Sequence, residues 1–278
     1  MLAGAMFSFM HGSIRYVSGG ASGADGLHPF EIAFFRNFFG LVALLPFLMR
    51  AGIRSLKTTR FSLHLWRAVL QVFSMLMFFS ALTMSPLADA TALCFLAPLF
   101  TTVGAILFLG EKARIRRWTA LIVGFAGAMI ILRPGFQEIS LGLVLVMGSS
   151  AIWGGAMLII KSLARTDSSV SIAAYMAILM TPMSLIPALF FWQMPTLEEY
   201  VGLFVIGAFG SIGHVMLAQA FKEAEASAIL PLDFTRLIWA AAVGYFLFGE
   251  VPGLWTWLGG GLIFSAATYV AYRESRAR

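Results

Sequence analysis

The sequence predicts an all-α integral membrane protein with ten transmembrane helices, arranged as an inverted five-plus-five repeat. Of the 278 residues, 60% are hydrophobic and only 12% are charged, whereas a soluble domain carries about 25% charged residues. The mean hydropathy of +0.88 is too high for a chain whose surface faces water. The apolar runs are continuous and do not alternate with polar residues as a membrane-spanning strand does, so they favour helices.

Ten apolar runs are each close to the length of about 20 residues that a helix needs to cross a bilayer. The connections between them are short, which predicts antiparallel neighbours and leaves no room for a soluble domain. The runs cover residues 2–18, 29–49, 62–83, 87–109, 115–133, 139–162, 169–192, 198–220, 226–248 and 254–272.

The basic residues of the loops predict the orientation, because short loops rich in Lys and Arg stay on the cytoplasmic side. With the N-terminus inside, only Arg15 and Arg133 fall in the outer segments. We therefore expect both termini to be cytoplasmic, in a multi-pass protein of a bacterial-type cytoplasmic (inner) membrane. The net charge of +6 is then topogenic, and no nucleic acid is expected as a partner.

The chain repeats a short pattern at an offset of 139 residues. Residues 107–111 read LFLGE and residues 246–250 read FLFGE, and each stretch is followed by a tryptophan, Trp118 or Trp257. The loop between the first pair is strongly basic, and the loop between the second pair carries no basic residue. By the same rule on basic loops, the first loop lies inside and the second lies outside.

The repeat extends towards the N-terminus, where Gly12 pairs with Gly154 at a slightly larger offset. Each copy then holds five spans. Because five is odd, the second copy must enter the membrane in the opposite sense, which agrees with the loop charges. We divide the chain into a first repeat, 1–135, and a second, inverted repeat, 136–278.

An inverted repeat of apolar helices is typical of secondary transporters, whose substrate site lies where the repeats meet. The sequence has no GxxxxGK[ST] loop for ATP and no HExxH or paired-aspartate motif of a membrane enzyme, so we expect no enzymatic activity, cofactor or metal. A channel is the other alternative, but channels usually form from rings of subunits or short filters. The expected partners are a small-molecule substrate and the lipid bilayer, and a complete inverted repeat can work as a monomer.

An ordered set of short motifs runs along the chain: residues 36–38 (RNF), 88–92 (ADATA), 97–100 (APLF), 109–111 (LGE), Trp153, 247–250 (LFGE) and 257–259 (WLG). Over essentially the whole chain, this set resembles the EamA-type transporters of the drug/metabolite transporter superfamily. The resemblance implies ten helices, an inverted five-plus-five repeat, a central cavity and alternating access. It also implies the export of amino acids or other metabolites.

Asp233 and Arg236 are the deepest charged pair in the predicted spans, and a charge at the bilayer centre costs about 2.5–3.5 kcal/mol on insertion scales. Their spacing of three places both on one face of a helix. One interpretation is a clamp for a zwitterion, in which the arginine binds a carboxylate and the aspartate binds an ammonium group. The other is a structural pair that neutralises itself.

Three further polar residues inside the spans are candidates for substrate contact. Arg36 is expected either to bind an anionic group or to pair with Glu31. His11 and His214 lie near the middle of their spans, where the alternative to a functional role is a hydrogen bond between helices. Arg67 lies nearer the end of its span, and we expect it to extend its guanidinium to the membrane surface.

Trp153, Tyr175 and Trp239 are candidates for the wall of the cavity, because such walls are mostly apolar and aromatic. Packing between helices is the alternative for each. Glu250 ends a helix at its C-terminus, where the helix dipole disfavours an anion. Since the sequence places no cation near it, a partner must come from elsewhere in the fold.

The function predicted from the sequence is the export of small amphipathic metabolites, with amino acids first, by alternating access through a central cavity. The reason is one cationic and one anionic group among aromatic walls. Vitamins, nucleosides and cationic drugs are the alternative cargoes.

Overall fold

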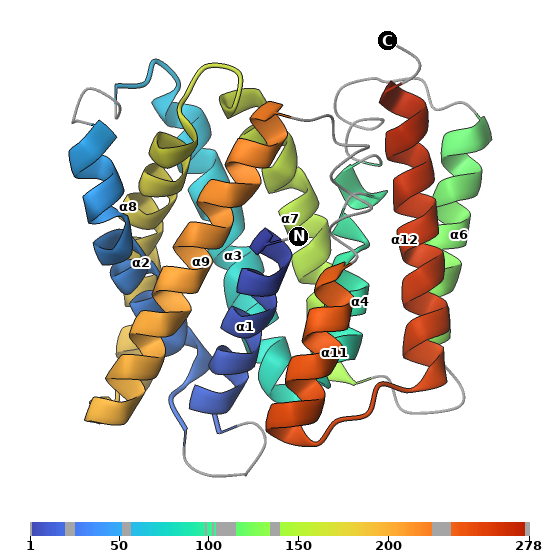
Figure 1. The fold of residues 1–278 in the computed structure, drawn as a ribbon, viewed down its shortest axis with the longest axis horizontal. Coiled ribbons are helices and arrows are strands. Elements are labelled where there is room, and N and C mark those ends of the chain that lie inside the picture. Colours follow the sequence, from blue (N-terminus) through green and yellow to red (C-terminus); the bar gives the residue numbers. More distant parts are fainter. Residues whose placement is uncertain are drawn as a thin grey trace.

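The computed structural model describes residues 2–19, 26–51, 57–97, 99–101, 103, 115–133, 140–223 and 235–275. The regular elements in these ranges are all helices, and they form one bundle (Figure 1). The helices are α1 Leu2–Val17, α2 Pro29–Ala51, α3 Phe61–Met84, α4 Leu87–Cys94, α6 Ile115–Leu132, α7 Leu141–Leu163, α8 Ser169–Ala188 with the short 3-10 helix η2 Leu189–Phe191, α9 Leu197–Glu223, α11 Thr235–Phe248 and α12 Leu254–Ser275.

Most helices begin and end close to the bounds that the apolar runs predict. In the described residues, five helices are long and apolar enough to cross a membrane: Pro29–Arg50, Phe61–Met84, Leu141–Ile160, Ser169–Phe191 and Leu197–Ala220. Residues 226–234, the start of the ninth predicted span, lie outside the described residues, and α11 follows them. The count of ten spans therefore stays a prediction.

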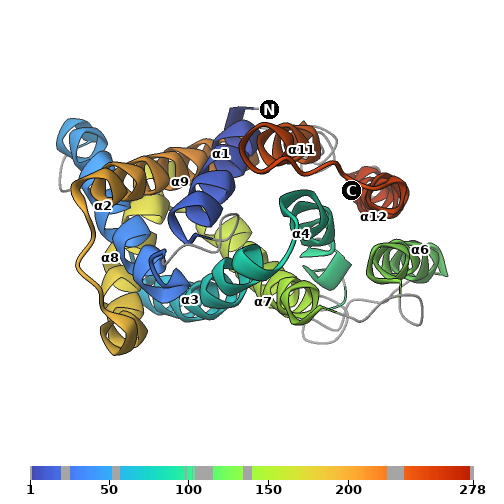
Figure 2. The ribbon, with the colours of Figure 1, turned by 90° about the horizontal axis from the view of Figure 1, so that it is seen from below.

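Helices that follow one another run antiparallel, so α1 and α7, which hold matching places in the two halves of the chain, point in opposite directions (Figure 1). The packing also follows an exchange of the halves. The contact of α3 with α7 corresponds to the contact of α9 with α1. In the same way, the contact of α1 with α11 corresponds to the contact of α7 with α4. Figure 2 shows α2 and α8 at one end of the elongated cross-section and α6 and α12 at the other.

The fourth predicted span is interrupted, since α4 ends at Cys94. The N–H groups of Phe95 and Leu96 donate to carbonyls three residues earlier, at 3.2 and 3.0 Å, which makes a tighter turn than an α-helix. Residue 98 is proline, which has no N–H to donate to a carbonyl four residues earlier, and the chain is helical again at Ala97. Ser150 of α7 donates to the carbonyl of Leu93 at 3.3 Å, so the interrupted backbone gains a side-chain partner.

Two paired glycines allow α1 and α7 to approach their neighbours closely. A Cβ atom on Gly154 would lie 2.7 Å from the carbonyl oxygen of Ala97, beside the break after α4. A Cβ atom on Gly12 would collide with the side chain of Val243 in α11. The sequence pairs these two glycines, and they stand at matching contacts between a first helix and the opposite half.

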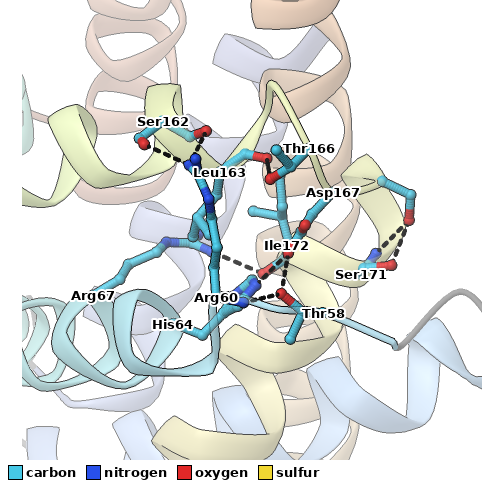
Figure 3. A network of polar contacts seen from close by, with 11 residues as sticks. Thr58, Arg60, His64, Arg67, Ser162, Leu163, Thr166, Asp167, Ser171 and Ile172 are labelled. Carbon is cyan, nitrogen blue, oxygen red and sulfur yellow. Dashed lines mark hydrogen bonds and ion pairs between the residues drawn. The ribbon is translucent and has the colours of Figure 1, made fainter.

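A polar cluster joins the two halves at one end of the bundle, here named the Asp167 end (Figure 3). Asp167, between α7 and α8, accepts from Thr58 at 2.9 Å and contacts Nε2 of His64 at 2.7 Å. Arg60 donates to the carbonyl and the hydroxyl of Ser162 at 3.3 and 3.0 Å. The start of α3 is therefore bound to the connection that follows α7.

Glu250 joins three helices at the opposite end, here named the Glu250 end. It forms an ion pair with Arg15 in the last turn of α1, and it accepts from the backbone N–H of Leu87, the first residue of α4, at 3.1 Å. The expectation that Glu250 takes its partner from elsewhere in the fold is confirmed. Thr256 of α12 also donates to Asp89 of α4 there.

Candidate functional site: a cavity between the two halves

A cavity of about 140 Å³ lies where helices from both halves of the chain meet. The first half contributes α1, α2, α3, the end of α4 and the break after it, and the second contributes α7, α9 and α11. Most of the wall is apolar or aromatic, which is the usual character of a small-molecule site. Its polar side chains are those of His11, Arg36, Gln71, Ser74, Ser149, Ser150, His214 and Arg236.

Arg36 is the most deeply placed cation of the cavity, with only 3% of its surface exposed. Its Nη1 donates to the side-chain carbonyl of Asn37 at 2.8 Å, and Asn37 donates to Ser184 of α8 at 3.1 Å. Its buried Nε has no acceptor among the described residues. A Cβ atom on Gly210 of α9 would lie 2.9 Å from this Nε, so a larger residue would displace the guanidinium. Arg36 and Glu31 are both described, and no ion pair joins them.

Arg236 reaches the cavity from the start of α11. Its Nη2 lies 3.5 Å from Nδ1 of His11, at the limit of a hydrogen bond, and its guanidinium carbon lies 5.6 Å from the ring centre of Phe7. Its backbone carbonyl accepts from the hydroxyl of Ser8 at 3.0 Å. The buried Nε of Arg236 also lacks an acceptor among the described residues.

Both histidines of the cavity stand edge-on to aromatic rings. The ring centre of His214 lies 5.1 Å from that of Phe7 and 5.9 Å from that of Trp153. The ring of His11 lies 4.8 Å from Phe78. Aromatic rings favour such edge-to-face arrangements, so the imidazoles are held in place by the wall.

The side of the cavity formed by α3 and α7 carries polar residues that the sequence did not single out as substrate contacts. Ser74 and Ser149 each donate to the backbone carbonyl of the other, at 3.0 and 2.9 Å. Nε2 of Gln71 lies 3.0 Å from the sulfur of Met176, and its buried Oε1 has no donor among the described residues. Gln71 and Ser74 are three residues apart, which places them on one face of a helix. This spacing is the one feature of the sequence that could have indicated their shared position.

The prediction that Arg67 extends to the membrane surface is wrong. Only 2% of the residue is exposed, and its Nη1 donates to the backbone carbonyl of Ile172 in α8 at 2.8 Å. Its Nη2 lies 3.5 Å from the sulfur of Met176. A carbonyl of a neighbouring helix thus replaces the water that an extended side chain would reach.

Of the eight residues predicted to bind substrate, His11, Arg36, Trp153, His214 and Arg236 line the cavity. Asp233 lies outside the described residues. Tyr175 stacks on His64 at the Asp167 end, with the ring centres 4.4 Å apart. Trp239 is 42% exposed and packs beside Phe9 of α1. Neither of these two aromatic residues lines the cavity.

Comparison with known proteins assigns the chain to a family. The model of the EamA-like transporter family matches residues 1–133 and again residues 140–272. A solved structure, described only as the crystal structure of a protein, superposes with a TM-score of 0.68 at 16% identity and covers 98% of this chain and 97% of that chain. At that identity, the likeness concerns the fold alone.

Several curated relatives cover most of the chain. An S-adenosylmethionine uptake transporter of Rickettsia bellii is 34% identical over 251 residues, which are 90% of this chain and 86% of that protein. A riboflavin transporter of Vibrio cholerae is 34% identical over 280 residues, covering 99% and 92%. A pseudopaline exporter of Pseudomonas aeruginosa is 28% identical, covering 96% and 92%. With both halves matched and such relatives along its length, this multi-pass membrane protein belongs to the EamA-like transporter family, a family of small-molecule transporters.

Proposed function

We propose that this chain carries a small metabolite with a planar ring system across the bacterial inner membrane, with the cavity between its halves as the substrate site. The observation that carries the proposal is the composition of the wall, to which both halves contribute helices and in which aromatic rings surround a few polar groups. Transporters of repeated architecture bind their substrates at such an interface.

The proposed mechanism is alternating access between residues 1–135 and 136–278. Two observations support an inverted relation of these two segments. The helices α1 and α7 point in opposite directions, and the contacts between helices are repeated when the two halves are exchanged. The loop charges favour the Asp167 end as the cytoplasmic face, with both termini on that side. In this mechanism the polar contacts at each end break in turn as the halves rock about the cavity.

The names of the relatives favour a cargo with a heteroaromatic ring. S-adenosylmethionine contains adenine and riboflavin contains a fused three-ring system, and Phe7, Phe78 and Trp153 provide faces and edges for such rings. Riboflavin is a vitamin and S-adenosylmethionine contains a nucleoside, so these compounds fall within two of the alternative cargoes named from the sequence. Amino-acid export, the first cargo predicted from the sequence, is a prediction that none of the relatives' names supports.

Counterflow in liposomes that contain the purified protein tests the proposal, because exchange is measured without assuming a direction of net transport. We expect labelled riboflavin or S-adenosylmethionine to exchange faster than in protein-free liposomes. Ser150→Phe, on the cavity wall, should reduce the exchange at least tenfold by filling the site. Val144→Phe, on the exposed face of the same helix, should leave it intact. Absence of exchange of both compounds, or full exchange by the Ser150→Phe protein, contradicts the proposal.

A further inference from the structure

The described lining of the cavity is positively charged and has no acid to balance it. Arg36 and Arg236 are its full charges, and no Asp or Glu is among the described residues that form the wall. Arg67 lies just outside the wall.

The hydrogen-bonding capacity of these two arginines is largely unused. Nε of each is buried without an acceptor among the described residues, and the close partner of Arg36 is the neutral amide of Asn37. Within the described ranges, Arg15 and Glu250 form an ion pair at one end of the bundle, and His64 and Asp167 form one at the other end when the imidazole is protonated. A buried charge without a counter-ion is unfavourable in protein and in membrane alike.

Arg67 shows what a structural arginine looks like in this fold. Its Nε also lacks an acceptor among the described residues, but its Nη1 is bound to a backbone carbonyl of α8 and fixes α3 against that helix. The distinction therefore lies in where the guanidinium groups are placed. Arg36 and Arg236 instead come from different halves, on α2 and α11, and both face the same cavity. Asp233, three residues before Arg236 in the sequence, lies outside the described residues, but the position and the unused Nε of Arg36 do not depend on it.

We propose that the cargo presents an anionic oxygen group, a carboxylate or a phosphate, to Arg36 and Arg236. The inference rests on the proposed function and narrows its substrate class to anionic or zwitterionic metabolites. The planar guanidinium matches both oxyanions with paired N–H groups. Gln71, with its unused Oε1 in the same wall, offers an acceptor to a donor group of such a cargo. Cationic compounds that lack an anionic group are excluded by the two arginines, which argues against cationic drugs as cargo.

Two matched pairs of probes test the inference by direct binding to the purified protein. S-adenosylmethionine is compared with its decarboxylated form, and riboflavin 5′-phosphate with riboflavin, so the pairs also distinguish a carboxylate from a phosphate. In at least one pair, the acid should bind at least tenfold more tightly to the wild type. The preference should fall below about threefold in Arg36→Met and Arg236→Met. Equal binding, in both pairs, of the members with and without the anionic group overturns the inference. Exchange of riboflavin in counterflow would still leave the proposed function standing.

A second measurement needs no ligand and decides the case in which none of the four probes binds. Arg236→Met removes a charge that has no counter-ion among the described residues, and it keeps the backbone carbonyl that accepts from Ser8. The ligand-free variant should therefore melt at or above the temperature of the wild type. The matched control, Arg67→Met, loses the hydrogen bond to Ile172 and should melt below it. If Arg236→Met melts as far below the wild type as the control does, Arg236 has a structural role and the inference fails.

Discussion

Asp167 is the residue on which the contacts at its end of the bundle converge. Burial raises the pKa of its carboxyl, but hydrogen bonds from His64, Thr58 and Thr166 outweigh burial, so the pKa lies below the ordinary value of 3.8. A carboxyl whose pKa is lowered by folding stabilises the folded state at pH values above its ordinary pKa. That contribution is lost as the pH falls through the lowered pKa.

We expect Asp167→Asn to destabilise the protein at pH 7 by about 1–3 kcal/mol, because a charged acceptor of several hydrogen bonds is lost. The difference from the wild type should shrink as the pH falls below the ordinary pKa of 3.8, because the stabilisation from the lowered pKa of the folded carboxyl is then progressively lost. Thermal unfolding of both proteins in detergent between pH 3 and 7 measures this. Glu198→Gln, at an exposed acid, is the control and should show little change. A gap between wild type and Asp167→Asn that stays constant with pH would show that the charge of Asp167 is not the cause.

At the scale of elements, α1, α4 and α11 meet at the Glu250 end. The dipole at the C-terminus of α11 disfavours the carboxylate of Glu250, whereas the N-terminus of α4 favours it. Pro86 provides no side-chain cap for α4, and Glu250 accepts the N–H of Leu87 instead. Arg15 supplies the counter-charge from α1 and also lies over the ring of Phe248. One carboxylate thus connects helices of both halves.

A double-mutant cycle of Arg15→Met and Glu250→Gln measures that connection. Each single change should destabilise the protein, because it leaves a partly buried group without its partner. The double change should cost less than the sum of the two, with a coupling energy of about 0.5–3 kcal/mol in thermal unfolding. Additive effects would mean that the two side chains do not interact in the membrane protein as purified.

At the scale of the whole molecule, the positions of the helices follow from the sequence because long apolar runs separated by short polar connections admit few other folds. The sequence was not interpreted as containing a break after α4, although Pro98, which lacks an N–H group, is a residue that interrupts helices. The pairing of Gly12 with Gly154 was visible in the sequence. That each of the two stands at a close helix contact required the structure.

The candidate site was predicted in part, for a physical reason. Charged and histidine side chains inside apolar spans are unfavourable in lipid, so their presence indicated an interior position, and Arg36, His11 and Arg236 do line the cavity. Aromatic residues carry no such cost, and the sequence could not show which face of its helix Tyr175 or Trp239 occupies. The buried position of Arg67 depends on a hydrogen bond to a backbone carbonyl of α8, and no sequence pattern reveals that acceptor.

Cys94 is the single cysteine of the chain and lines the cavity at the end of α4. It therefore reports directly on whether the cavity opens to both sides of the membrane. The decisive measurement is labelling of Cys94 by a membrane-impermeant methanethiosulfonate, applied separately to right-side-out and inside-out vesicles, with Cys94→Ser as the blank. Alternating access predicts labelling from both sides. Labelling from one side only, or from neither, would contradict it.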